Sequence, residues 1–329
     1  MPVRVGIPHY LGYFSFYPLW KTFFEEIGLE VITSPPTNQQ ILNAGVAEAV
    51  NDACIPIKLY HGHVMEIKDQ VDLLFVPRFV KVRKLGTETF CPKFLALPDL
   101  LRASIGNLPE LLDTRVDLTR GRFELFRIAR EIGERFGVAP ARISRAYIIA
   151  CRALRRYRGL MFKGAPAEEA LACLETDSKA VVQNKQGELS IAVLGYPYLI
   201  YDNFINMDLI KRLRSFGARV FTAEMVSPRK LLREAKNMPK QMFWYYSNRA
   251  MHAAYYYLNR MRVDGIIHVT AFACGPDAML DRLMEMESRK WGRMPFLTLS
   301  LDEETGTGGV ETRLEAFIDM LKRRKVVPL

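Results

Sequence analysis

The stretch Gly265-Ile266-Ile267-His268-Val269-Thr270, followed by Phe272-Ala273-Cys274-Gly275-Pro276-Asp277, decides the fold that we expect for this chain. The first segment is apolar and rich in β-branched residues, so it predicts a buried strand. The Cys-Gly-Pro turn ends that strand and opens a helix. Open α/β sheets bind their ligands at the carboxyl ends of strands, and we therefore expect the thiol of Cys274 at such an edge.

The same pattern of a cysteine followed closely by proline occurs twice more, as Cys54-Ile55-Pro56 and as Cys91-Pro92. Proline fits the first turn of a helix, because its missing N–H has no partner there. A cysteine at the amino end of a helix is favoured as a thiolate by the exposed N–H groups and the helix dipole. We interpret Cys54, Cys91 and Cys274 as one constellation of three thiolates around an iron–sulfur cluster.

The other two cysteines, Cys151 and Cys173, have no proline beside them and lie in apolar helical sequence. They are typical of small residues that pack on helices. Five scattered cysteines do not form the compact spacing of a disulfide framework, a ferredoxin or a zinc ribbon. We expect Cys151 and Cys173 to be structural.

Strand and helix patterns alternate through most of the chain, which predicts parallel sheets with helices on both faces. The segment 190–198 repeats the pattern of 3–10, and each is followed by an amphipathic helix and a second strand. This weak internal repeat is explained by two similar α/β domains. We therefore predict an N-terminal α/β domain at 1–104, a helical connecting region at 105–187 and a C-terminal α/β domain at 188–329.

The composition of the 329 residues is that of a globular protein, with 49% hydrophobic and 25% charged residues. No apolar window of about twenty residues is long enough to span a membrane. The N-terminus enters a strand directly, without a secretory signal, and this predicts a cytoplasmic location. A net charge of +10 favours an anionic partner. The absence of zinc-finger, RNP and basic-zipper patterns argues against nucleic acid.

The residues alone leave two interpretations of the cysteines open: a shared metal or cluster, or unrelated core and turn residues. A structural zinc would need a fourth ligand, for which His61 and His63 are the nearest candidates. His61 follows Cys54 by two helical turns and would share its face of the helix. We name His61 and His63 as candidate catalytic residues that donate a proton. Buried structural histidines explain the pattern equally well.

Two further features are ambiguous. The arginine-rich segment 142–158 fits either a site for a phosphate-bearing ligand such as coenzyme A, a docking face for an activator, or a solvated basic face. The glycine-rich turn 306–309 precedes a helix and fits either an anion site or an ordinary loop.

Several motifs in order along the chain resemble those of the 2-hydroxyacyl-CoA dehydratase and benzoyl-CoA reductase-like family. Within it they are most similar to the single-chain group related to the extension of large acyl-CoA dehydratase activases. The likeness covers nearly all of the chain except the central helices. The motifs are Tyr17-Pro18-Leu19-Trp20-Lys21, Ser34-Pro35-Pro36-Thr37-Asn38, Asp52-Ala53-Cys54-Ile55-Pro56, Tyr60-His61-Gly62-His63, Phe90-Cys91-Pro92-Lys93-Phe94, Cys274-Gly275-Pro276-Asp277, Asp302-Glu303-Glu304-Thr305-Gly306 and Gly309-Val310-Glu311-Thr312-Arg313-Leu314-Glu315-Ala316-Phe317.

The resemblance implies two flavodoxin-like (Rossmann-like) α/β domains with a 4Fe–4S cluster held between them by three cysteines. It implies that the fourth iron is left for water, a side chain or substrate. It also implies a separate ATP-hydrolysing activator of the actin-like superfamily that delivers a low-potential electron. On this basis we expect one cubane per chain, held by Cys54, Cys91 and Cys274, under anaerobic conditions.

Two functions follow from the resemblance. The first is an iron–sulfur reductase or dehydratase that acts on a small molecule, with an acyl-CoA as the candidate substrate. The second is a non-catalytic electron-transfer or cluster-handling partner of an activase. The open fourth position favours the enzyme, since an electron carrier usually closes its cluster with four thiolates. The single-chain form, in contrast to two-chain dehydratases, leaves the substrate open and makes a homodimer one candidate assembly.

Overall fold

The computed structural model describes residues 2–83, 88–121, 123–176, 187–291 and 294–326. The contacts between residues divide the chain into two compact units. The N-terminal unit comprises Met1–Arg158 with Phe243–Tyr245, and the C-terminal unit comprises Gly159–Met242 with Tyr246–Leu329. Each contains one four-stranded parallel sheet. The predicted boundaries at residues 104 and 187 stay a prediction.

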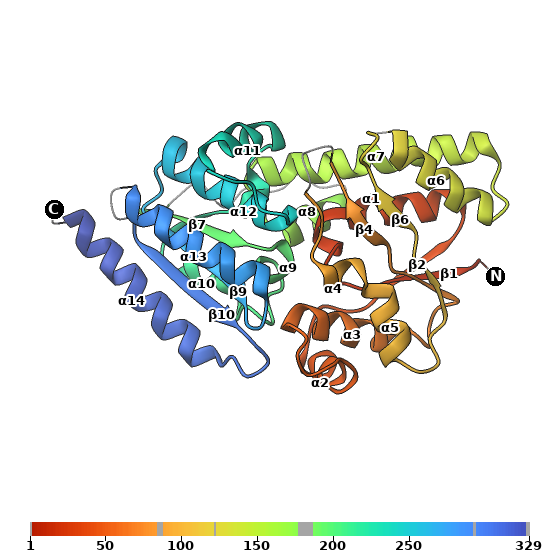
Figure 1. Ribbon diagram of the computed structural model, residues 1–329, viewed down its shortest axis with the longest axis horizontal. Helices are drawn as coiled ribbons and strands as arrows, with labels where there is room; N and C mark the ends of the chain where they lie inside the picture. Colours follow the sequence, from red (N-terminus) through yellow and green to blue (C-terminus); the bar gives the residue numbers. More distant parts are fainter. Residues whose placement is uncertain (1, 84–87, 122, 177–186, 292–293, 327–329) are drawn as a thin grey trace. The chain divides into compact units, whose positions relative to one another are not determined.

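The N-terminal unit is built from short strands and helices that alternate along the chain (Figure 1). Its strands are β1 (Arg4–Ile7), β2 (Glu30–Thr33), β3 (Leu73–Phe75), β4 (Arg78–Lys81), β5 (Glu110–Leu112) and β6 (Arg115–Asp117), and its helices are α1 (Tyr13–Ile27), α2 (Gln39–Glu48), α3 (Ile55–Ile67), α4 (Pro92–Leu95), α5 (Leu97–Ser104), α6 (Phe123–Arg135) and most of α7 (Pro140–Phe162).

The C-terminal unit follows the same alternation with longer strands. Its strands are β7 (Leu189–Gly195), β8 (Ala218–Phe221), β9 (Gly265–Ala271) and β10 (Phe296–Leu301). Its helices are α8 (Ala167–Glu175), α9 (Pro197–Ile200), α10 (Leu209–Ser215), α11 (Pro228–Glu234), α12 (Tyr245–Tyr256, which begins in the N-terminal unit), α13 (Gly275–Lys290) and α14 (Thr307–Val326).

The two four-stranded sheets have the same strand order. The order is β2-β1-β3-β5 in the N-terminal unit and β8-β7-β9-β10 in the C-terminal unit, with all neighbours parallel. Every residue of β7 and β9 is buried, as expected for central strands covered on both faces. The α/β class and the parallel sheets predicted from the sequence are therefore confirmed, and the weak repeat corresponds to a repeated topology.

Two short strands, β5 and β6, lie in the segment that we predicted to be a helical connection. β5 pairs with β3 and completes the N-terminal sheet, while β6 pairs with β4 in a separate two-stranded sheet. Strands of three residues carry too little periodicity to be recognised from sequence. Their pairing partners lie some distance back along the chain, so only the folded structure reveals them.

Helix α1 continues through a proline. It runs from Tyr13 to Ile27 with Pro18 inside it, and its C-cap is Gly28, which has a left-handed φ of 98°. Pro18 has no N–H to donate to the carbonyl of Phe14 four residues earlier. The hydroxyl group of Tyr157 donates to that carbonyl instead, at 2.8 Å, and so satisfies it.

Helices α2 and α3 pack backbone against backbone through two glycines. A Cβ atom at Gly45 would lie 2.0 Å from the carbonyl oxygen of Lys58, and one at Gly62 would lie 1.9 Å from that of Ile41. The side chain of Asn38 caps α2 by accepting from the N–H of Ile41 at 3.0 Å. This close approach holds in place the helix that begins next to Cys54.

Replacement of Gly62 by alanine is expected to destabilise the N-terminal unit by about 3 kcal/mol or more, because backbone atoms cannot move aside as side chains do. Gly159→Ala is the matched control, since nothing lies within 4 Å of a Cβ atom at that helical position. That change should stabilise α7 by roughly 0.5–1 kcal/mol. Urea unfolding of both variants measures the difference, and equal stabilities would contradict the packing described here.

Candidate functional site

The three predicted cluster ligands share one local structure. Cys54, Cys91 and Cys274 are the N-cap residues of α3, α4 and α13, and each helix has a proline in its first two positions. The backbone of Cys54 (φ −67°, ψ 151°) is nearly the same as that of Cys91 (φ −64°, ψ 155°). Each cysteine is therefore positioned by a strand or loop that leads into a proline-initiated helix.

Two of these cysteines lie near each other in the N-terminal unit. Burial is the largest influence on Cys91 and raises the pKa of its thiol, and the charge of Cys54 raises it further. The backbone N–H groups of Phe94 and Lys93 and the charge of Lys93 oppose this rise without overcoming it. The Lys93 ammonium also donates to the carbonyl oxygen of Asp52 at 2.8 Å, which ties α4 to the segment before Cys54.

We expected the amino end of a helix to favour the thiolate form of a cysteine, but the pKa of the Cys91 thiol is raised. The helix supplies the expected N–H donors, but burial next to a second thiol outweighs them. A bound cation would reverse this balance, because metal binding releases the thiol proton and supplies the missing positive charge. The donor set thus fits a thiophilic metal or an iron–sulfur cluster.

Cys274 lies in the C-terminal unit and directly follows a strained residue. Ala273 has a φ of 60°, in the left-handed region that residues with a Cβ atom seldom adopt. Cys274 lies between β9 and β10, and Cys91 lies between β3 and β5. Strand β9 holds the same place in its sheet as β3, and β10 holds the same place as β5. Cys91 and Cys274 are therefore related by the repeat, whereas Cys54 lies in the segment before β3.

A buried ionic cluster holds the first turns of α13 against β9. His268 is fully buried, and its Nδ1 lies 2.7 Å from Oδ1 of Asp281 while its Nε2 lies 3.3 Å from Oδ1 of Asp277. Asp277 also accepts from the N–H of Ala271 at 3.1 Å, and Asp281 accepts from the hydroxyl group of Thr298 at 2.8 Å. These contacts connect the strand that precedes Cys274 with the helix that follows it.

The two carboxylates keep His268 charged. Burial by itself lowers the pKa of the imidazole, but hydrogen bonds and charge interactions with Asp277 and Asp281 outweigh it and raise the pKa to about 9. The same pairing contributes to the lowered pKa of Asp281. His268 was not among our predicted site residues. Its sequence signal is the polar residue in the apolar strand 265–270.

The predicted catalytic histidines have different surroundings. In His63 the atoms Nδ1 and Nε2 lie 2.8 Å from Ser34 Oγ and 2.9 Å from Thr37 Oγ1, and burial, followed by the charge of His9, lowers its pKa to about 3. His61 donates from Nδ1 to the carbonyl oxygen of Ile57 at 2.8 Å, and burial lowers its pKa as well. Both imidazoles are therefore neutral at pH 7.

The structure brings Cys54 and Cys91 together in one unit and carries Cys274 on the other. Within the described ranges, no three histidine, cysteine, aspartate or glutamate side chains already form a group that could hold a metal. Cys151 on α7 and Cys173 on α8 are half-buried and lie apart from the proline-led turns. The assignment of Cys54, Cys91 and Cys274 to one cluster stays a prediction.

The arginine-rich helix α7 presents one apolar and one basic face. Ile143, Ala146, Ala150 and Leu154 are buried at helical spacing. Arginines between them are mostly exposed, and Arg142 donates to the carbonyl oxygen of Glu26 at 2.9 Å. This pattern is that of a basic surface helix.

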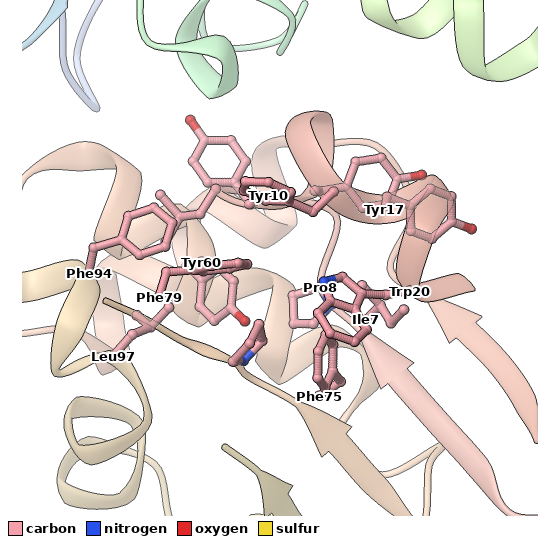
Figure 2. A pocket seen from close by; sticks show the side chains of 15 residues that line it. Ile7, Pro8, Tyr10, Tyr17, Trp20, Tyr60, Phe75, Phe79, Phe94 and Leu97 are labelled. Carbon is pink, nitrogen blue, oxygen red and sulfur yellow. The ribbon is translucent and has the colours of Figure 1, made fainter. Parts of the chain in front are cut away.

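Sequence reasoning missed an aromatic pocket in the N-terminal unit (Figure 2). It lies beyond the ends of β1 and β3, and two of its residues, Tyr60 and Phe94, belong to the helices that begin at Cys54 and Cys91. The spacing of aromatic residues from Tyr13 to Trp20 along α1 was an available signal. The lining residues are Ile7, Pro8, Tyr10, Leu11, Gly12, Tyr13, Phe16, Tyr17, Trp20, Tyr60, Phe75, Pro77, Phe79, Phe94 and Leu97.

Because Asp277 and Asp281 raise the pKa of His268, the stability of the protein should depend on pH. The ion pairs contribute fully below pH 6.5, the ordinary pKa of histidine in the unfolded chain. Their contribution is lost as the pH rises through about 9, the pKa of His268 in the folded protein. We expect the C-terminal unit to lose on the order of 2–3 kcal/mol over that interval. Urea unfolding of the wild type and of His268→Gln at pH 6.5 and 9 measures this loss. A wild type that is equally stable at both values would refute the pairing, and His252→Gln should retain the wild-type dependence.

Comparison with known families gives two matches. The model of the CoA enzyme activase uncharacterised domain (DUF2229) matches residues 4–226, from β1 to the turn after β8. The model of the 2-hydroxyglutaryl-CoA dehydratase D-component matches residues 161–321, which includes Cys274 and the ionic cluster of His268. A search of the curated proteins found no match.

The two matches overlap and together extend over both sheets, and they agree with the resemblance seen in the motifs around the cysteines. The first covers more than half of the chain and includes Cys54 and Cys91 in their proline-led turns. The chain is thus related to acyl-CoA dehydratases, and it belongs to the family defined by the CoA enzyme activase uncharacterised domain.

Proposed function

We propose that this protein is a low-potential iron–sulfur reductase or dehydratase in which Cys54, Cys91 and Cys274 hold a 4Fe–4S cluster. The observation that carries the proposal is the shared setting of these three thiols at the amino ends of proline-initiated helices. The proximity of Cys54 and Cys91 in one unit supports it, because two neighbouring thiols that are largely removed from water are costly to ionise without a metal.

The protein groups around each thiol would stabilise it as a ligand. The backbone N–H groups of Phe94 and Lys93 and the positive charge of the Lys93 side chain each act to lower the pKa of the Cys91 thiol. The strained turn at Ala273 and the ionic cluster of His268 fix the course of the chain on both sides of Cys274. When bound, a cluster of this type supplies a low-potential electron and an iron that accepts an oxygen ligand.

His61 and His63 remain our candidates for proton transfer. A neutral imidazole carries one N–H and one lone pair, so one of the hydroxyl groups on His63 accepts from it and the other donates to it. A proton can therefore pass through Ser34, His63 and Thr37 without a charged imidazole. His61 keeps its Nδ1 proton on a carbonyl oxygen, which leaves Nε2 as an acceptor.

A coenzyme A thioester is the substrate class that the family supports. Both matching families are described by coenzyme A chemistry, and the net charge of +10 and the basic face of α7 suit an anionic ligand or partner. We infer an ATP-hydrolysing activator of the actin-like superfamily as electron donor.

No helix in the described part of the chain is both long and apolar enough to cross a membrane. The cytoplasmic location and a homodimer stay predictions.

A second function, as a non-catalytic electron-transfer or cluster-handling partner of an activase, is supported by a different observation. The longer of the two family matches is to a domain named for coenzyme A enzyme activases. The number of cysteine ligands distinguishes the two functions. Three thiolates leave one iron of the cluster free to bind a substrate, whereas an electron carrier needs no iron with an open position.

The cluster assignment predicts the result of cysteine replacement. Anaerobically purified protein should be brown and contain about four irons per chain. Cys54→Ser, Cys91→Ser and Cys274→Ser should each abolish the colour, because serine is a poor ligand for these irons. Iron analysis and the visible spectrum measure the loss of the cluster.

Cys151→Ser and Cys173→Ser are matched controls that should keep the full iron content of the wild type. Retention of iron in Cys274→Ser would overturn the three-thiolate assignment, and a colourless protein with one zinc would support a structural metal.

The enzyme reading predicts that one iron is labile. Ferricyanide oxidation should remove it and produce a three-iron electron-paramagnetic-resonance signal, and ferrous iron with a reductant should restore the original spectrum. Cyanide or an acyl-CoA should change the spectrum of the reduced protein. A cluster that resists oxidation and ignores these ligands would favour the electron-carrier function.

A further inference from the structure

A short segment from the second half of the sequence belongs to the N-terminal unit. Phe243–Tyr245, which we call the strap, is assigned to that unit by its contacts, although the residues before and after it belong to the C-terminal unit. The strap forms an isolated parallel bridge with Thr89, which lies two residues before Cys91. It therefore brings residues that are distant in sequence next to a candidate cluster ligand.

Backbone hydrogen bonds join the strap to Thr89 on both sides. The N–H group of Thr89 donates to the carbonyl oxygen of Phe243 at 2.8 Å, and the N–H group of Tyr245 donates to the carbonyl oxygen of Thr89 at 2.8 Å. The hydroxyl group of Thr89 also donates to the carbonyl oxygen of Val80 in β4 at 2.8 Å. Thr89 is thus held by β4 and by the strap.

Side chains reinforce this pairing. The centre of the Tyr245 ring lies 5.3 Å from that of Phe90, which is 2% exposed, and the Phe90 ring lies 5.0 Å from that of Phe94 in α4. The guanidinium group of Arg83 lies over the Tyr245 ring, 5.3 Å from its centre, in the geometry of a cation–π contact. The strap therefore packs against the buried residue that directly precedes Cys91.

The helix that begins at Cys91 depends on such contacts. Helix α4 contains four residues, and an isolated helix shorter than about 12 residues is marginal in water. The Lys93 ammonium donates to the carbonyl oxygen of Asp52 at 2.8 Å. The Arg78 guanidinium donates to the carbonyl oxygen of Leu95 at 3.0 Å. These two bonds hold the helix itself, while the strap holds the residues that lead into it.

The strap is itself fixed at both ends. The side chain of Asn248, which is 1% exposed, accepts from the N–H group of Met242 at 2.9 Å and donates to the carbonyl oxygen of the same residue at 2.8 Å. Tyr245 at the other end is the first residue of α12. A segment that is already ordered loses little conformational entropy when it pairs, so its two hydrogen bonds hold Thr89 more effectively.

We propose that the strap is the positioning element of Cys91: its backbone pairing with Thr89 and the ring of Tyr245 hold this thiol in place for the cluster. The role of Cys91 as a ligand rests on the proposed function, whereas the control of its position by the strap needs no iron. When the pairing opens, residues 88–90 are released and the half-buried thiol becomes more accessible. The strap acts through Thr89 and supplies no ligand of its own.

The experiment measures the rate at which iodoacetamide alkylates each cysteine of the full-length, iron-free protein, read by mass spectrometry. Tyr245→Ala removes the ring and keeps the N–H group, whereas Tyr245→Pro removes both. Proline suits this position because it begins α12 and because Trp244 before it lies in a β-bridge. Phe243→Ala is the matched control, since the Phe243 ring is 56% exposed and its backbone carbonyl makes the bond to Thr89.

We expect Cys91 to react several-fold faster in Tyr245→Ala than in the wild type. In Tyr245→Pro it should react about fivefold faster again, the value of one backbone hydrogen bond. Phe243→Ala should keep the wild-type rate. Cys151 in the N-terminal unit and Cys173 in the C-terminal unit are internal references, because a general loss of stability would raise all rates together. In iron-loaded protein, a chelator should remove iron several-fold faster from Tyr245→Pro than from Phe243→Ala.

Hydrogen exchange of the wild type tests the pairing without a substitution. The N–H groups of Thr89 and Tyr245 are the two donors of the pairing. Both should be protected from exchange, and both should open with the same equilibrium constant, because one opening of the strap releases them together. Lack of protection at either amide would overturn the proposal.

Equal Cys91 rates in Tyr245→Pro and Tyr245→Ala would contradict positioning by the backbone pairing. A parallel rise at Cys151 and Cys173 would show general destabilisation and would also overturn the proposal. If Tyr245→Pro does not fold, Tyr245→Ala and hydrogen exchange of the wild type decide the question.

The alkylation rates come from iron-free protein, so this experiment and the cysteine replacements fail independently. A chain without a cluster would refute the proposed function and leave the strap in place. Unchanged alkylation of Cys91 would refute the strap and leave the cluster in place.

Discussion

Parallel pairing of the strands is the constraint on which the candidate site depends. When all strands of a sheet run the same way, every segment that follows a strand begins at one edge of that sheet. In the C-terminal unit this edge receives Cys274 after β9 and Tyr196 after β7. In the N-terminal unit it receives the loop after β1, the Ser34 hydroxyl group after β2 and the pocket beyond β3. The chemistry gathers at these edges because the sheet directs the chain there.

Each unit contains a buried histidine, and the two histidines have opposite charge states at neutral pH. His63 has two hydroxyl partners, Ser34 and Thr37, and burial is the largest influence that lowers its pKa and keeps it neutral. His268 lies between Asp277 and Asp281, whose combined attraction exceeds the cost of burial and keeps it protonated. The same side chain is therefore a neutral hydrogen-bonded group in one unit and part of an ionic cluster in the other. The difference comes from the two carboxylates beside His268, whose attraction outweighs a cost of burial that both histidines bear.

Close backbone packing and a left-handed residue occur in the segments that carry two of the three cysteines. Gly45 and Gly62 let α2 and α3 touch next to the start of α3, and the left-handed Ala273 precedes Cys274 directly. Both features cost conformational freedom or local energy. Helix α1 shows how a local defect is compensated. Pro18 cannot donate to the carbonyl oxygen of Phe14, and the hydroxyl group of Tyr157 donates to it instead.

The amino-acid sequence by itself determined the α/β class, the parallel sheets, the repeated topology and the proline-led turns at Cys54, Cys91 and Cys274. These features follow from local periodicity and from the backbone preferences of proline and glycine, which act over a few residues. Only the tertiary structure decided the pairing of β5 with β3, the charge of His268, the neutrality of His63 and the pocket around Trp20. Each of these depends on groups that are distant in sequence, and pKa values and cavities arise from such neighbours rather than from local pattern.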